Sequence, residues 1–165
     1  SNTANNFGGA IAMYDGELFV DNSIIGSTEK EHGENIAMNM GGGLYVQGGI
    51  VTIKNSEFSS NTALIGGNIY LSSDKTANIT DTSIVDGNAT RVNIGTDVLG
   101  GGIYVDGAKL NITGKETVIS GNRAYAGAGI AIAERGYNDS EVRLSGITIT
   151  ENIGDLIGAI YVKQC

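Results

Sequence analysis

The hexapeptide GGGIYV at residues 100–105 decides the fold, because close versions of it occur six times in the 165-residue sequence. The other copies are GGAIAM (8–13), GGGLYV (41–46), GGNIYL (66–71), GAGIAI (127–132) and IGAIYV (157–162). The apolar residues that follow the glycines in these copies are Ile11, Leu44, Ile69, Ile103, Ile130 and Ile160, at spacings of 33, 25, 34, 27 and 30 residues. Repeats of this length are typical of solenoids.

Each repeat contains three short segments in which apolar residues alternate with other residues. The first is the glycine phrase itself, the second is exemplified by Leu110–Ile112, and the third ends in an apolar-x-x-Asn pattern such as Ile119–Asn122. Alternation with period two indicates strands, and no apolar stripe has helical spacing. The sequence therefore predicts an all-β, parallel β-helix solenoid of about six coils with three short strands per coil, forming one domain over residues 1–165.

The composition supports this fold and excludes several functions. Glycine accounts for 26 residues, proline and tryptophan are absent, and 41% of residues are hydrophobic, which is enough for a packed interior. The net charge of −8 disfavours binding to nucleic acids and anionic membranes. No apolar run approaches the roughly 20 residues of a membrane-spanning helix. Cys165 is the only cysteine, so no internal disulfide can form.

Asparagines recur at one point of the repeat, often followed two residues later by alanine. Asn tolerates left-handed backbone and hydrogen-bonds neighbouring amides at tight turns. Stacked coil upon coil, such side chains form an amide ladder. We therefore predict a structural ladder, and not a site of chemistry, at Asn61, Asn88, Asn122 and Asn152.

The combination of GGAI at Gly8–Ile11 and FSSN at Phe58–Asn61 resembles the repeats of the chlamydial polymorphic outer membrane proteins. Gly158–Tyr161 (GAIY) and the IxxN and VxxN segments are looser forms, and the resemblance covers essentially the whole chain. It implies a right-handed β-helix that is extracellular or on the cell surface. It also implies a role as a stalk or passenger in adhesion.

Tyrosine occupies the same position in four of the six glycine phrases, at Tyr45, Tyr70, Tyr104 and Tyr161. Because the flanking aliphatic residues point inward, alternation places these rings on the outside of the sheet. Such a row of aromatic rings is suited to bind sugar rings or a partner protein, so the four tyrosines are the candidate binding residues. The preferred interpretation is an aromatic ladder that stiffens the sheet, or a face covered by another strand or copy.

Asp74 and Asp106 follow the first strand in adjacent repeats and are the candidates for metal binding. They could share a Ca²⁺ ion, or with Lys75 and Lys109 form the site of a carbohydrate-active β-helix lyase or hydrolase. Solvated turn residues are the preferred interpretation, so no cofactor and no enzymatic activity are expected. His32 lies in a charged insertion and is expected to be hydrated rather than a Zn²⁺ ligand.

Three departures from the repeat length, at residues 26–34, 89–99 and 133–141, predict loops on the solenoid surface. The sequence starts and stops within repeats, so we expect an uncapped segment of a longer rod or copies that stack end to end. The predicted function is the structural stalk or binding shaft of an adhesin-like surface protein. Its expected partner is a surface protein or glycan of a host or neighbouring cell. The alternatives are the carbohydrate-active enzyme and a self-assembling fibre subunit.

Overall fold

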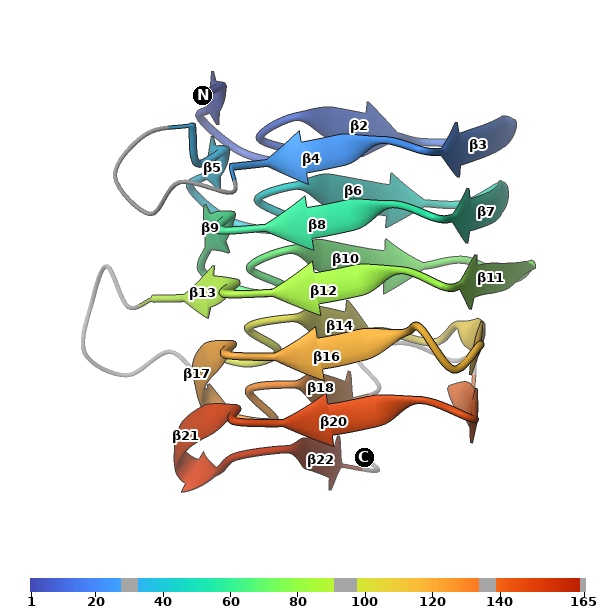
Figure 1. Cartoon of the computed structure of the whole chain (residues 1–165). Coiled ribbons are helices and arrows are strands. Elements are labelled where there is room, and N and C mark those ends of the chain that lie inside the picture. The colour runs from blue at the N-terminus through green and yellow to red at the C-terminus, as the bar shows by residue number, and fades with distance from the viewer. Residues whose placement is uncertain (28–32, 91–97, 134–138, 164–165) are drawn as a thin grey trace.

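The computed structural model describes residues 1–27, 33–90, 98–133 and 139–163, and every regular element in these ranges is a strand. The chain winds into a parallel β-solenoid whose coils stack from the N-terminal to the C-terminal end (Figure 1). All strand pairs within its four sheets are parallel. Within the described ranges, no helix is long and apolar enough to cross a membrane.

The glycine phrases lead into one six-stranded sheet. Its strands are β2 (Ile11–Met13), β6 (Leu44–Gln47), β10 (Ile69–Ser72), β14 (Ile103–Val105), β18 (Ile130–Ala133) and β22 (Ile160–Lys163). The second sheet has five strands: β3 (Glu17–Asp21), β7 (Ile50–Lys54), β11 (Thr76–Thr80), β15 (Lys109–Thr113) and β19 (Glu141–Ser145).

The third sheet also has five strands: β4 (Ile24–Gly26), β8 (Glu57–Ser59), β12 (Ser83–Val85), β16 (Val118–Ser120) and β20 (Thr148–Thr150). A fourth, six-stranded sheet contains β1 (Thr3–Ala4), β5 (Ile36–Ala37), β9 (Thr62–Ala63), β13 (Asn88–Ala89), β17 (Arg123–Ala126) and β21 (Ile153–Ile157).

The prediction of a parallel β-solenoid is therefore confirmed, but the prediction of three strands per coil is wrong. The residues that follow each ladder position, such as Thr62–Ala63, pair with the adjacent coils and form a fourth sheet. The pattern hid this strand because two residues are too few to show alternation. They are held in place by pairing with neighbouring coils and not by a hydrophobic pattern of their own.

Aliphatic side chains from three of the sheets fill the interior in register. Ile69 pairs with Leu44 on one side and Ile103 on the other, and all three belong to the main core cluster. Burial depends on neighbouring coils: Ile112 is fully buried, whereas its register partner Leu144 in the last coil is 37% exposed. This dependence on adjacent repeats is expected of a solenoid.

The glycine phrase permits a tight arch at which neighbouring coils touch through their backbones. Gly41 has a positive φ of 66°, which favours glycine, and a Cβ there would collide with the carbonyl oxygen of Leu44. A Cβ on Gly42 would collide with the carbonyl oxygen of Gly67 in the next coil. The glycines are therefore required by close approach within and between coils.

A ladder of asparagine side chains runs along the axis through all described coils and is buried in its four inner members. Each amide donates a hydrogen bond to the Oδ1 atom of the next member, with Nδ2–Oδ1 distances of 2.7–3.2 Å. Most of the members also donate to a backbone carbonyl, as Asn61 does to Ile25 at 2.9 Å. In order, the ladder consists of Asn2, Asn35, Asn61, Asn68, Asn122 and Asn152.

The ladder includes the predicted Asn61, Asn122 and Asn152, but Asn68 stands where Asn88 was predicted. Asn88 pairs with Thr62, one residue beyond the ladder position, and the ladder position itself is Gly87. Asn68 lies in the glycine phrase and extends its amide into the space above Gly87, 2.5 Å from where a Cβ on that glycine would be. The asparagine and the glycine have thus exchanged places in this coil.

Three other inner coils show the opposite arrangement of the same pair. A Cβ on Gly43 would lie 2.9 Å from the Asn61 amide, and Gly102 stands in the same relation to Asn122 at 3.1 Å. In these inner coils only one large side chain fits between the two positions, so an asparagine on one side is matched by a glycine on the other. In the first coil the residue equivalent to Gly43 is Ala10. The ladder was predicted only from the apolar-x-x-Asn segment of each repeat. That prediction could not include Asn68, which lies in the glycine phrase.

Replacing Asn68 by Ala tests the ladder. The substitution removes the acceptor for Asn61 and both amide bonds donated by Asn68, at a site with no solvent exposure. We expect the free energy of unfolding to fall by about 3 kcal/mol, because buried polar groups lose their partners. Chemical denaturation measures this loss. In the control, Asn111→Thr places at an outward strand position the residue type found at Thr52 in the same register. It removes one partly buried hydrogen bond, from Asn111 to Asn78 at 3.1 Å, whose groups can bond to water instead, so the loss of stability should be well below that of Asn68→Ala.

Candidate functional site: a corner groove and a tyrosine column

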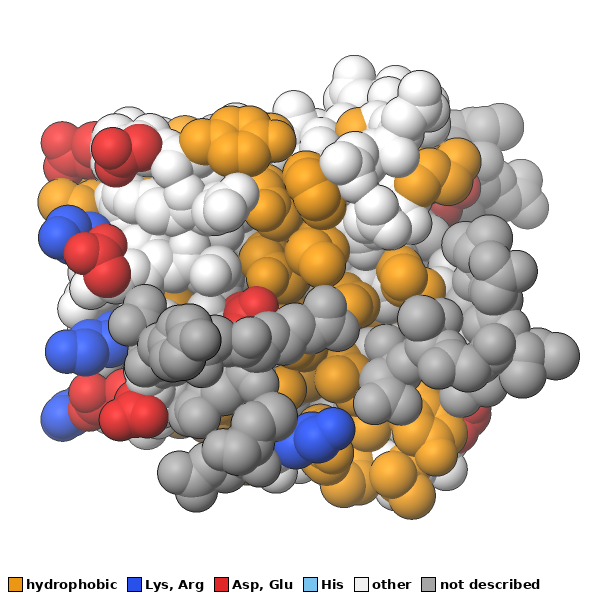
Figure 2. All heavy atoms as spheres, turned by 180° about the vertical axis from the view of Figure 1, so that it is seen from behind, with side chains coloured by type: hydrophobic (Ala, Val, Ile, Leu, Met, Phe, Trp, Pro, Cys, Tyr) orange, Lys and Arg blue, Asp and Glu red, His pale blue; other side chains and the backbone are white. Residues whose placement is uncertain are grey.

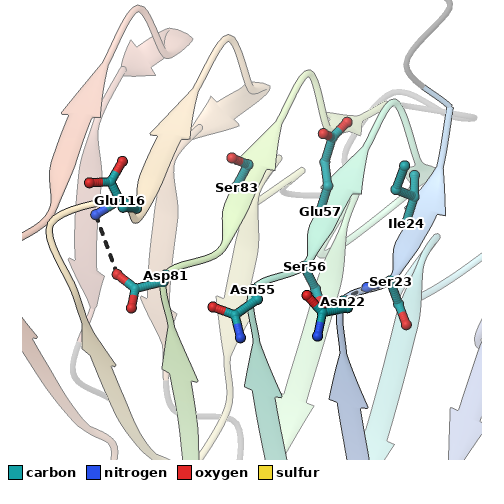
Figure 3. A pocket seen from close by; sticks show the side chains of 9 residues that line it. All are labelled: Asn22, Ser23, Ile24, Asn55, Ser56, Glu57, Asp81, Ser83 and Glu116. Atoms are coloured by element: carbon teal, nitrogen blue, oxygen red, sulfur yellow. Dashed lines mark hydrogen bonds between the residues drawn. The ribbon is translucent and has the colours of Figure 1, made fainter.

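A groove follows the corner between the second and third sheets, where the chain takes left-handed backbone in successive coils. Asn22, Asn55 and Asp81 have φ values of 48°, 47° and 45° at equivalent positions. Asn and Asp adopt this conformation more readily than other residues with side chains. The three side chains stand in a row at the mouth of the groove, one per coil (Figure 3).

A ladder of hydroxyl groups forms beneath this row. The backbone N–H of Ser23 donates to the Ser56 hydroxyl at 3.2 Å, that of Ser56 to Thr82 at 3.4 Å, and that of Thr82 to Thr117 at 3.3 Å. Each of the last three hydroxyls also donates to a nearby backbone carbonyl. These hydroxyls are therefore engaged within the fold. The recurring Asn-Ser and Asp-Thr pairs at 22–23, 55–56 and 81–82 were the sequence signal for this ladder.

The polar groups that face the groove come from outward positions. The groove has a volume of about 610 Å³, and its lining includes Glu57, Ser83 and Glu116 beside the Asn and Asp row. Within the row, the side chain of Asp81 accepts a hydrogen bond from the backbone N–H of Glu116 at 3.4 Å (Figure 3). Of the residues that the structure describes, three with carboxylates and none of Lys or Arg line the groove. This arrangement offers hydrogen-bond acceptors and disfavours anionic ligands.

A second feature is the tyrosine column on the outer face of the first sheet, formed by Tyr45, Tyr70 and Tyr104. The ring centroids of Tyr45 and Tyr70 lie 5.1 Å apart, and those of Tyr70 and Tyr104 lie 5.5 Å apart, with nearly parallel planes. Phe7 stacks on Tyr45 at 4.6 Å and extends the column toward the N-terminal end. Strand register imposes the stacking, since the three tyrosines pair directly across adjacent strands.

The prediction that these rings face away from the main core is confirmed, and Tyr45, Tyr70 and Tyr104 lie on a covered face instead of an open one. Tyr45 and Tyr70 are 5% exposed and Tyr104 is fully buried. The residues that precede the glycine pairs, among them Ile65 and Leu99, pack against the rings because the glycine arch folds them back. Figure 2 shows this face as a band of hydrophobic side chains along the axis. The structure therefore favours the ladder interpretation of these tyrosines.

Tyr161 has the same register position in the last coil but is separated from Tyr104 by Ala131. It is partly buried against the same cluster. The alanine interrupts the stacking, so the column proper ends at Tyr104. A binding role for Tyr161 stays a prediction.

The two predicted metal-binding aspartates have different partners. Asp106 is 8% exposed, and its Oδ2 accepts a hydrogen bond from the Tyr70 hydroxyl at 2.7 Å. Asp74 is exposed and forms an ion pair with Lys75 at 2.8 Å, and the hydrogen bond in this pair lowers the pKa of Asp74. Among the described residues, no three His, Cys, Asp or Glu side chains gather as a metal site. A shared Ca²⁺ stays a prediction, with Asp106 already engaged by Tyr70.

The predicted loops fall largely outside the described residues. Residues 28–32, which include His32, lie there, as do residues 91–97 and 134–138. Cys165 also lies outside the described part of the chain.

Comparison with protein-family models, with curated proteins and with solved structures finds no match to this chain.

The tyrosine column predicts a specific loss of stability at high pH. Burial, and then the hydrogen bond to Asp106, raise the pKa of Tyr70 above its ordinary value of 10.0. Above pH 10 the unfolded chain releases this proton while the folded chain keeps it, so folding stability falls as pH rises, by up to ~1.4 kcal/mol per pH unit. Thermal melts between pH 9 and 11 should show a steeper decline for the wild type than for Tyr70→Phe. Equal slopes would contradict the assignment.

Proposed function

We propose that this chain is the structural shaft of an extracellular, adhesin-like protein of the cell surface. The observation that carries the proposal is the continuity of side-chain ladders along the axis. The asparagine ladder, the hydroxyl ladder and the aliphatic core each join one coil to the next. Such a structure is a rod that holds its two ends at a fixed separation, and its length is set by the number of coils.

The proposal also includes a right-handed winding and an extracellular location. The right-handed winding is supported by the general preference of parallel crossover connections for that hand. The location rests on the resemblance of the GGAI and FxxN repeats to a family of surface proteins. The chain has no proposed catalytic role.

The corner groove is the proposed contact surface of the shaft. It is a recess of about 610 Å³, it is lined mostly by polar side chains, and it spans several coils. Its carboxylates favour a partner that presents hydrogen-bond donors and carries no net negative charge. A surface protein with exposed amides or a neutral glycan of a neighbouring cell meets this requirement.

Insertion of one extra coil tests the shaft. Residues 36–61 form a complete repeat of 26 residues from one ladder position to the next, all of them described. A second copy inserted after Asn61 should add one strand to each sheet and lengthen the rod by ~4.8 Å. Small-angle X-ray scattering measures the length. Chemical denaturation should show equal or greater stability, because each repeat adds an interface. An aggregated or destabilised product would show that coils are not interchangeable units.

Attachment of protein-coated beads tests the contact surface. The wild-type chain should hold beads on cultured cells or on a neutral glycan array. The double variant Glu57→Ala/Ser83→Ala changes two adjacent outward positions in the groove. We expect it to weaken attachment about tenfold, equivalent to ~1.4 kcal/mol.

The matched control is Thr76→Ala/Lys109→Ala, an adjacent pair on the outer face of the second sheet. It should leave attachment unchanged. Equal losses in both variants would remove the groove from the proposal, and failure of the wild type to attach to any surface would remove the adhesive role.

A further inference from the structure

A chain of four tyrosine rings connects the protein surface to a buried carboxylate. Tyr14 is 59% exposed, and its ring centroid lies 5.9 Å from that of Tyr45 in an edge-to-face arrangement. From Tyr45 the stacked column continues through Tyr70 to Tyr104. Only the first of these rings is open to solvent. At such separations, neighbouring aromatic rings exchange electrons readily.

One ring in this chain has a proton acceptor beside it. The Tyr70 hydroxyl donates to Asp106 Oδ2 at 2.7 Å, and both residues are buried. A phenol that loses an electron becomes a strong acid and must release its proton. Oxidation is therefore favoured at the ring whose proton can move directly to a carboxylate. The Tyr45 hydroxyl, in contrast, donates to the neutral amide oxygen of Gln47 at 3.0 Å.

We propose that Tyr14, Tyr45 and Tyr70 carry one-electron oxidation from the surface to a buried site at Tyr70. A one-electron oxidant, such as a small inorganic radical, takes an electron from Tyr14, and the Tyr14 hydroxyl proton goes to water. Tyr14 then recovers an electron through Tyr45 and a proton from water. Tyr70 supplies that electron and transfers its proton to Asp106. The products are reduced oxidant, intact Tyr14, and a Tyr70 phenoxyl radical beside a protonated Asp106.

This transfer protects Tyr14 from covalent cross-linking to another molecule. Two exposed tyrosyl radicals on different molecules couple through their rings to form dityrosine. A radical at Tyr70 is 5% exposed and cannot meet a second ring from another molecule. A one-electron reductant such as ascorbate restores the tyrosine, and Asp106 returns the proton. The activity does not depend on the proposed shaft function, so the test of one proposal does not decide the other.

The test uses azidyl radicals generated by pulse radiolysis, which oxidise exposed tyrosine; the chain has no tryptophan to compete. Mass spectrometry measures the cross-linked peptides that contain Tyr14. In the wild type we expect few of them. Tyr45→Phe keeps an aromatic ring in the stack but removes the relay, so cross-links at Tyr14 should rise several-fold. Tyr70→Phe and Asp106→Asn should have the same effect, because each removes part of the buried site.

Tyr161→Phe is the matched control, since Ala131 separates this ring from the column. It should leave the Tyr14 cross-links at the wild-type level. Thermal melts establish that each variant is folded at the temperature of the experiment. If folded Tyr45→Phe and Tyr70→Phe both give the wild-type yield, oxidation does not leave Tyr14 through the column and the proposal is overturned.

Discussion

The hydrogen bond between asparagine side chains in successive coils is the constraint on which the rest of this fold depends. A solenoid corner brings polar backbone groups inside, where each needs a partner. The asparagine amide fulfils several of these needs at once, because its oxygen accepts from the previous side chain and backbone while its nitrogen donates onward. The small residues around the ladder, and the glycines above all, leave the space that these side chains occupy.

The hydrogen bonds and packing that the interior requires determine which side chains remain at the surface for function. The hydroxyl ladder uses Ser56 and Thr82 internally, so the corner groove offers the outward carboxylates and amides above them. The glycine arch likewise covers the tyrosines and turns an outward row of rings into a second packed layer. Because equivalent residues pack in the same way in each coil, the surface features line up along the axis and cross several coils.

Much of this structure could be predicted from the sequence, because the repeat itself is visible. The parallel solenoid, the three longer strands of each coil and the inward register of the aliphatic residues follow from the spacing and alternation of residues such as Leu44 and Ile103. The fourth strand has two residues in most coils and no pattern to detect. The cover over Tyr70 depends on the backbone direction at the glycine arch, which residue types alone do not reveal. The groove arises from the left-handed backbone at positions such as Asn55, and its signal was overlooked.

The exchange between Asn68 and Gly87 has a consequence for how such a chain can change over generations. In each of the inner coils, the asparagine and the glycine that makes room for it lie within the same repeat, from one ladder position to the next. A whole repeat can therefore be duplicated or lost by recombination without separating the two. A crossover between the two positions that joins the 62–87 repeat to a repeat of the opposite arrangement would unite two asparagines in one space or leave two glycines and a gap. Selection then acts on whole coils as inherited units.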